Sequence, residues 1–286
     1  MFYPVFASRP ARLVLLFVTL FVGLCVASLS CGFFDILFGQ GTRTALLCQS
    51  AAQAVFAFII PAYVSVKIAY GNAYDELGIS RGFSVSAILI TLAIMFTAVP
   101  FLNQIISLNE SIAFSPDIEK VFRQWENQAL SATNSMLDTD TVSGLVSGVL
   151  VVGLLTGIGE EFFFRGALQK MLRGKGVSAH GAIWIAATVF SIMHFQPYGF
   201  VPRLLLGAFF GYLYWWSGTI WLPVIAHAVN NSMVVIVAWI RNCGADMRWF
   251  ETCGTSDDGT LWISAMSFVV AGSLTYIASR IIPNSK

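Results

Sequence analysis

The chain has 286 residues, of which 57% are hydrophobic and only 11% are charged, and its formal net charge is +1. An ordinary soluble domain carries about 25% charged residues, so this composition excludes a soluble globular protein. A net charge near zero, without a basic stripe to meet phosphates, excludes a nucleic-acid-binding protein. The composition instead predicts an all-α, polytopic membrane protein that is embedded in a lipid bilayer.

Eight apolar stretches approach the ~20 residues that a helix needs to cross a bilayer. In chain order they cover residues 12–29, 45–70, 84–106, 143–172, 179–196, 202–216, 220–240 and 261–282. The first stretch follows Arg9 and Arg12 and is long for the apolar core of a secretory signal. We therefore expect about eight transmembrane helices, the first of which is a spanning helix rather than a cleaved leader.

The longest polar segment, residues 107–141, contains a predicted amphipathic helix at 116–127. Its apolar residues Ile118, Val121, Phe122 and Trp125 recur at i, i+3, i+4 and i+7, the spacing of one helix face. This face either dips into the membrane surface or packs on neighbouring spans. The segment completes an N-terminal part, residues 1–141, with three expected spans. Residues 142–286 form the second part of what we expect to be one membrane-embedded unit.

The distribution of Lys and Arg among the connections predicts the orientation, because cytoplasmic loops are enriched in these residues. The clearest bias is the basic cluster at residues 170–175, between the fourth and fifth expected spans. It predicts that both termini are cytoplasmic. This orientation fits a bacterial inner membrane, with the endoplasmic reticulum membrane as the alternative.

The cysteines allow two interpretations. Cys31 and Cys48 flank the first outer connection, and Cys243 and Cys253 both lie in the last one. An oxidising outer compartment would permit a disulfide in each. Free thiols in apolar surroundings are the alternative.

Ionisable and polar residues inside the apolar stretches are the candidates for function, because a charge at membrane depth is costly unless it is paired or faces a polar cavity. They form three clusters on the fourth, fifth and seventh expected spans: Glu160, Glu161 and Arg165; His194; and His227 with Asn231.

Helical spacing sorts these residues. Glu161 and Arg165 are four residues apart, which predicts an ion pair on one helix face. Glu160 points about 100° away and has no partner on its own helix. Counted from the inner helix ends, Glu160, His194, His227 and Asn231 lie at depths of about 12 to 21 Å. This agreement predicts one intramembrane polar pocket, although each His or Asn taken singly could be an interhelical hydrogen-bonding residue.

Three motifs occur in order along the chain: Glu-Glu-x-x-x-Arg at 160–165, Phe-x-x-x-His at 190–194 and His-x-x-x-Asn at 227–231. They resemble the motifs of the CAAX prenyl protease and bacteriocin-processing family (CPBP, also called Abi), whose members are intramembrane proteases. The resemblance covers roughly residues 143–240. It implies that Glu161 and Arg165 organise the catalytic site.

The resemblance also implies the roles of the remaining motif residues. Glu160 would activate the attacking water, and His194 would help to position it. His227 and Asn231 would stabilise the tetrahedral oxyanion. A buried carboxylate suits a general base, and imidazole and amide donors suit a developing negative charge.

A zinc ion is an alternative source of the nucleophile, since the family has also been described as metalloprotease-like. Its ligands would be Glu160, His194 and His227. The chain contains no His-Glu-x-x-His motif, and Asn is a poor zinc ligand. We therefore favour metal-free hydrolysis without a cofactor, acting on a membrane-associated peptide or protein.

Two other classes of protein would also place polar residues at membrane depth. In a proton-coupled transporter, Glu160, His194 and His227 would form a proton relay, but the sequence shows neither an inverted repeat nor paired broken helices. A non-catalytic membrane scaffold would retain the pocket without the reaction. Proteolysis that depends on Glu160 separates the enzyme from both.

Overall fold

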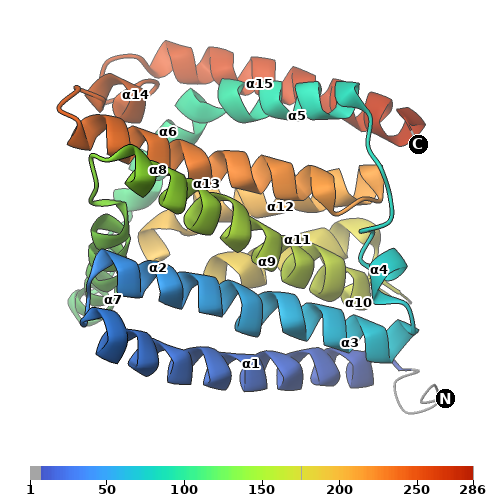
Figure 1. The fold of residues 1–286 in the computed structure, drawn as a ribbon. Coiled ribbons are helices and arrows are strands. Elements are labelled where there is room, and N and C mark those ends of the chain that lie inside the picture. The colour runs from blue at the N-terminus through green and yellow to red at the C-terminus, as the bar shows by residue number, and fades with distance from the viewer. Residues whose placement is uncertain (1–7, 175, 286) are drawn as a thin grey trace.

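The computed structural model describes residues 8–174 and 176–285 as a bundle of helices (Figure 1). The predicted all-α fold is confirmed, with 82% of residues in helices and no strand among those described. An isolated bridge joins Gly174 and Val177. Lys175 of the basic cluster, residues 1–7 and residue 286 lie outside the described part of the chain.

The helices divide between the two parts of the chain. The first part contains α1 (Arg9–Phe38), α2 (Arg43–Ala52), η1 (Gln53–Ile59), α3 (Ile60–Tyr70), α4 (Ala73–Glu76), α5 (Val85–Thr97), α6 (Val99–Glu110) and α7 (Pro116–Leu137). The second part contains α8 (Val142–Gly148), η2 (Val149–Leu155), α9 (Thr156–Glu161), η3 (Phe162–Gln169), α10 (Lys170–Leu172), α11 (Ala179–Ile192), η4 (Pro197–Gly199), α12 (Phe200–Ser217), α13 (Trp221–Asn242), α14 (Arg248–Thr252), α15 (Leu261–Ile281) and η5 (Ile282–Ser285). Residues 43–70 and 142–172 are two continuous helices, which contain the π-helical segments η1, η2 and η3.

Five of these helices are long and apolar enough to cross a membrane: 9–38, 43–70, 142–172, 221–242 and 261–281. The chain is therefore an integral membrane protein. The pair α5 and α6 would make a sixth span, bent by 45°, and Pro100 in the first turn of α6 accounts for the bend. The apolar helix α11 is shorter, with 14 residues. The expected count of about eight spans is thus approximate.

The ends of the helices follow ordinary capping chemistry. Ser84, Thr141 and Ser178 each accept a hydrogen bond from a backbone N–H in the first turn of the helix that follows, which satisfies a donor left unpaired at the helix start. Gly218 ends α12 in the left-handed conformation, with φ 69°, which costs glycine little. The capping residues thus fix where α5, α8, α11 and α12 begin or end.

Close packing on both sides of α9 positions the candidate site. A Cβ at Gly157 would lie 3.3 Å from the Ala228 nitrogen, and a Cβ at Gly159 would lie 2.9 Å from the Ala54 carbonyl oxygen. Small residues let helices in a membrane approach this closely. As a result, the side chains of α9 lie within reach of both α13 and η1.

The predicted amphipathic helix is present as α7, and it extends to Leu137. Its aromatic face packs on the protein: Phe122 contacts Phe114, and Trp125 meets Phe195 edge to face at 5.8 Å between ring centroids. Of the two predicted placements, the structure supports packing on neighbouring segments. Trp125 remains 39% exposed.

The four cysteines near the connections that we expect on the outer side, Cys31, Cys48, Cys243 and Cys253, are free thiols. Cys243 is exposed and its sulfur contacts the Asp140 carbonyl, whereas Cys253 is buried. The alternative with free thiols therefore describes this structure.

Candidate active site

The first motif lies in the middle of the long helix 142–172. Glu161 is the last residue of α9 and Arg165 lies one turn later in η3. Both side chains are fully buried, and Arg165 Nη1 donates to Glu161 Oε1 at 2.7 Å. The ion pair predicted from the spacing is therefore present.

The guanidinium of Arg165 also contacts α12 and α11. Its Nη2 donates to the Gly207 carbonyl at 2.9 Å, and its Cζ lies 4.7 Å from the centroid of the Phe190 ring. A Cβ at Gly207 would come within 3.2 Å of Nη2, so only glycine leaves full space here. One buried cation thus joins η3, α11 and α12.

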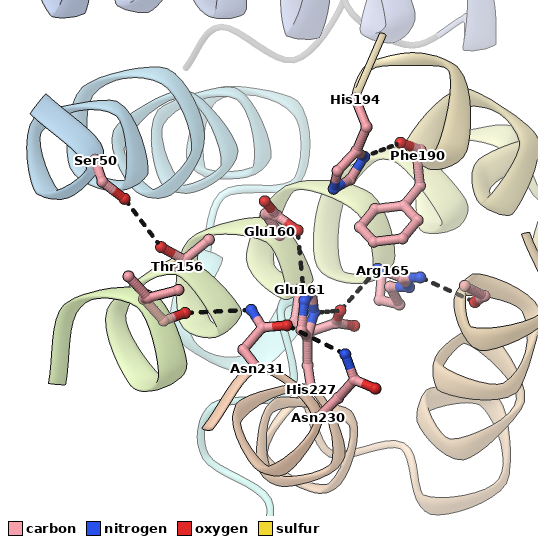
Figure 2. Close-up of polar contacts among 12 residues, drawn as sticks. Ser50, Thr156, Glu160, Glu161, Arg165, Phe190, His194, His227, Asn230 and Asn231 are labelled. Carbon is pink, nitrogen blue, oxygen red and sulfur yellow. Dashed lines mark hydrogen bonds and ion pairs between the residues drawn. The ribbon is translucent and has the colours of Figure 1, made fainter. Parts of the chain in front are cut away.

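His227 on α13 lies between the two glutamates. Its Nδ1 is 2.6 Å from Glu161 Oε1, and its Nε2 is 3.5 Å from Glu160 Oε2 (Figure 2). Because an ionised carboxylate only accepts hydrogen bonds, Nδ1 is the donor and carries the proton. The ring stacks on Phe210 at 5.0 Å. Glu161 therefore orients His227 so that Nε2 faces Glu160.

Glu160 points away from the Glu161–Arg165 pair and into a cavity. The cavity has a volume of about 230 Å³ and is lined by Ser50, Gln53, Ala54, Phe58, Thr156, Glu160, Phe164, Met193 and His194. Glu160 is 9% exposed, and its Oε2 has no hydrogen-bond partner among the described residues. Oε2 is the oxygen that faces His227, while the Glu160 side chain as a whole lines the cavity and can meet water there.

His194 lies just after α11, on the wall of the same cavity. Its Nδ1 is 2.8 Å from the Phe190 carbonyl oxygen. A carbonyl oxygen can only accept, so Nδ1 carries the proton and Nε2 of the neutral ring has a lone pair. His194 can therefore accept a hydrogen bond through Nε2.

Asn231 lies one turn beyond His227 on α13. Its Nδ2 donates to the Val152 carbonyl in η2 at 3.2 Å, and its Oδ1 accepts from Asn230 at 3.3 Å (Figure 2). Neither Asn231 nor His227 is among the residues that line the cavity of Glu160 and His194. Of the four predicted catalytic residues, Glu160 and His194 share the cavity, His227 contacts Glu160 from α13, and Asn231 lies one turn further along that helix.

Three polar residues in the cavity wall were not predicted from the sequence. Ser50 and Thr156 are within hydrogen-bonding distance at 3.5 Å, and Gln53 begins the π-helical segment η1. Thr156 precedes Glu160 by four residues, so helical spacing alone would place both on one face. For Ser50 and Gln53 the available signal is a polar side chain within an apolar stretch.

The described side chains do not form a metal site. No group of three or more His, Cys, Asp or Glu residues between 8 and 285, residue 175 aside, is placed to hold a metal ion. The Nδ1 atoms of both histidines hydrogen-bond to other groups, so each histidine could offer only Nε2 to a ligand. In this arrangement Glu160, His194 and His227 do not fit a shared zinc ion.

Comparison with protein families adds independent information. Residues 142–233 match the family described as type II CAAX prenyl endopeptidase Rce1-like. The resemblance to CAAX proteases is therefore confirmed for this region. The Rce1-like region runs from α8 into α13 and contains all six candidate residues.

A curated protein also matches part of the chain. Over 89 residues the chain is 27% identical to the uncharacterized protein YpbD of Bacillus subtilis (strain 168), and this match covers 30% of the chain and 42% of YpbD. The chain thus spans less than half of that relative. No solved structure matches the chain.

Proposed function

We propose that this protein is an intramembrane endopeptidase in which Glu160 activates water for hydrolysis of a peptide bond in a membrane-associated substrate. The observation that carries the proposal is the position of Glu160, whose carboxylate meets His227 on one side and a cavity shared with His194 on the other. The match of residues 142–233 to Rce1-like endopeptidases supports the same reaction class.

Glu160 and His194 would act on the water. The water oxygen attacks the carbonyl carbon of the scissile bond while the Glu160 carboxylate takes one of its protons. His194 accepts a hydrogen bond from the same water through Nε2, because its Nδ1–H is held by the Phe190 carbonyl. When the tetrahedral intermediate collapses, the C–N bond breaks and Glu160 returns the proton to the leaving amine.

His227 and Asn231 would stabilise the oxyanion. The Glu161 carboxylate holds Nδ1–H of His227, and Nε2 would donate to the oxyanion when it also carries a proton. One N–H of Asn231 Nδ2 donates to the Val152 carbonyl, and the other N–H can donate to the substrate oxygen. Loss of one such donor typically lowers kcat by about 10²–10³-fold. Because neither residue lines the cavity, we expect the substrate to open the space between the cavity and α13.

The test is cleavage of a membrane-anchored peptide by the purified protein in lipid vesicles. We expect Glu160→Gln to lower kcat/KM by about 10²–10⁴-fold, the usual contribution of a general base. Glu251→Gln is the matched control, since Glu251 is a surface residue that pairs with Arg241. Equal cleavage by Glu160→Gln and wild type would exclude the mechanism. A wild type that cleaves nothing but carries protons across the vesicle membrane would favour the transporter class.

We further propose that both termini lie on the cytoplasmic side of a bacterial inner membrane. The start of α1 and the end of α15 lie at the same end of the bundle as α10, the helix that begins at Lys170 in the basic cluster (Figure 1). This arrangement is consistent with a cytoplasmic face enriched in Lys and Arg.

A further inference from the structure

A polar link connects the surface helix α7 with the turn that carries His194. Glu126 on α7 accepts a hydrogen bond from Gln196 Nε2 at 3.0 Å. On the other side, Arg203 of α12 donates to Gln196 Oε1 at 2.6 Å and to its backbone carbonyl at 3.1 Å. Gln196 is thus held by a carboxylate and a guanidinium, two residues after His194. All three hydrogen bonds involve a charged group, which makes them stronger than neutral ones.

The backbone between His194 and Gln196 adopts an unfavourable conformation. Phe195 has φ 52° and is the one residue other than glycine with positive φ in the described ranges 8–174 and 176–285. The left-handed conformation is unfavourable for a residue with a Cβ, so it persists only when surrounding contacts impose it. The contacts here are the Phe195 ring against Trp125 and the two charged partners of Gln196. Two of the three groups that contact the turn, Trp125 and Glu126, belong to α7.

This turn determines where His194 points. His194 is the second residue after α11, and its backbone N–H bonds weakly to the Ser191 carbonyl at 3.4 Å. The Phe190 carbonyl orients the ring, but the helix has ended, so the backbone at His194 depends on the turn that follows. A shift of the turn would move Nε2 relative to Glu160 across the cavity.

We propose that Glu126 is a positioning residue for His194, acting through Gln196. The inference concerns α7, which lies outside the matched residues 142–233, so it adds an element of this chain to the site. Its catalytic consequence rests on the proposed role of His194 in hydrolysis. The structural link between Glu126 and His194 does not depend on that role, so the link and its effect on catalysis can be tested separately.

The structural test uses the imidazole signals. The chain has three histidines, so nitrogen-15 spectra of histidine-labelled protein contain three ring systems, assigned with single His→Gln variants. We expect Glu126→Ala to shift the ring signals of His194 and to leave those of His180 unchanged. Gln128→Ala is the matched control, since Gln128 lies about 200° around the same helix and lines a separate surface pocket. It should leave all three unchanged.

The functional test separates chemistry from binding. We expect Glu126→Ala to lower kcat about tenfold with little change in KM, because misplacement of a catalytic group by about 1 Å can cost up to 10²-fold. Glu126→Gln keeps an acceptor for Gln196 Nε2 and should recover most of the loss. Gln196→Ala removes the link from its other end and should reproduce the effect of Glu126→Ala.

Each result decides one part of the proposal. An unchanged His194 spectrum in both Glu126→Ala and Gln196→Ala overturns it, even if the wild type cleaves peptides. If Glu126→Ala shifts the His194 signals but the wild type cleaves no peptide, the link is supported and the proposed function is excluded instead. Equal kcat for Glu126→Ala and Gln128→Ala overturns its catalytic consequence.

Discussion

Arg165 connects three helices through one side chain. It pairs with Glu161, donates to Gly207 of α12 and lies over the Phe190 ring of α11. Removing one partner of a buried ion pair strands the other charge and typically costs about 3–5 kcal/mol. We therefore expect Arg165→Ala to lower folded yield and thermal stability as well as activity. Unfolding in detergent measures this, and normal stability without activity would place Arg165 in direct contact with substrate.

Arg165→Lys is the complementary variant. A lysine ammonium is a point charge that does not reproduce the planar, two-pronged geometry toward Glu161 and Gly207. We expect it to recover less than half of the stability lost in Arg165→Ala, as judged by the unfolding midpoint. Full recovery would show that charge alone, rather than the guanidinium geometry, is required.

Chelation distinguishes water activated by Glu160 from water bound to a metal ion. We expect the protein to cleave peptide after exhaustive chelation, and active preparations to contain well below one equivalent of transition metal by elemental analysis. If zinc carries the nucleophile, chelation abolishes cleavage and one equivalent of added zinc restores it. Glu160→Gln is inactive under both mechanisms, so it serves only as the background control.

The sequence predicted the contact within one helix of this site but not the contacts between helices. The Glu161–Arg165 pair follows from positions on a single helix, where spacing fixes distance. The sequence did not indicate that His227 would bond Glu161 through Nδ1 and face Glu160 through Nε2. That depends on how closely α13 approaches α9 at Gly157, a property of packing between helices. The same reason explains why Ser50 and Gln53 were not predicted in the cavity wall.

At the scale of the elements, the contact between α9 and η1 sets the width of the cavity. Because a Cβ at Gly159 would lie 2.9 Å from the Ala54 backbone oxygen, Gly159→Ala must push the two helices apart. Overpacking of this kind costs about 1–3 kcal/mol, and we expect a lower unfolding temperature together with reduced cleavage. Gly272→Ala on α15 is the control, since nothing lies within 4 Å of its added Cβ. Equal stability of the two variants would contradict the tight contact.

Some elements could be predicted and others could not. Periodicity indicated α7, and apolar length indicated the five long spans. The bend between α5 and α6 was not expected, because Pro100 was placed within a single stretch at 84–106. The three π-helical segments were not expected either, since a widened turn preserves the apolar composition. They flank the site, and η2 supplies the Val152 carbonyl that holds Asn231.

At the scale of the whole molecule, the proposed orientation places the connection after α13 outside the cytoplasm. Cys243 is exposed in that connection. We expect a membrane-impermeant maleimide to label it in intact cells from which the outer membrane has been removed. Cys243→Ser is the control for labelling at other thiols. Labelling that requires permeabilised cells would reverse the orientation.

The Glu161–Arg165 pair has a consequence for biosynthesis. Charged residues are costly to insert into a bilayer, and α12 and α13 do not yet exist when residues 142–172 emerge from the ribosome. Because both partners lie on the same helix four residues apart, they can neutralise each other before any later helix is made. Glu160 has no such partner until His227 has been synthesised 67 residues later. The span can therefore enter the membrane with its ion pair complete, whereas Glu160 gains a partner only after α13 has been synthesised.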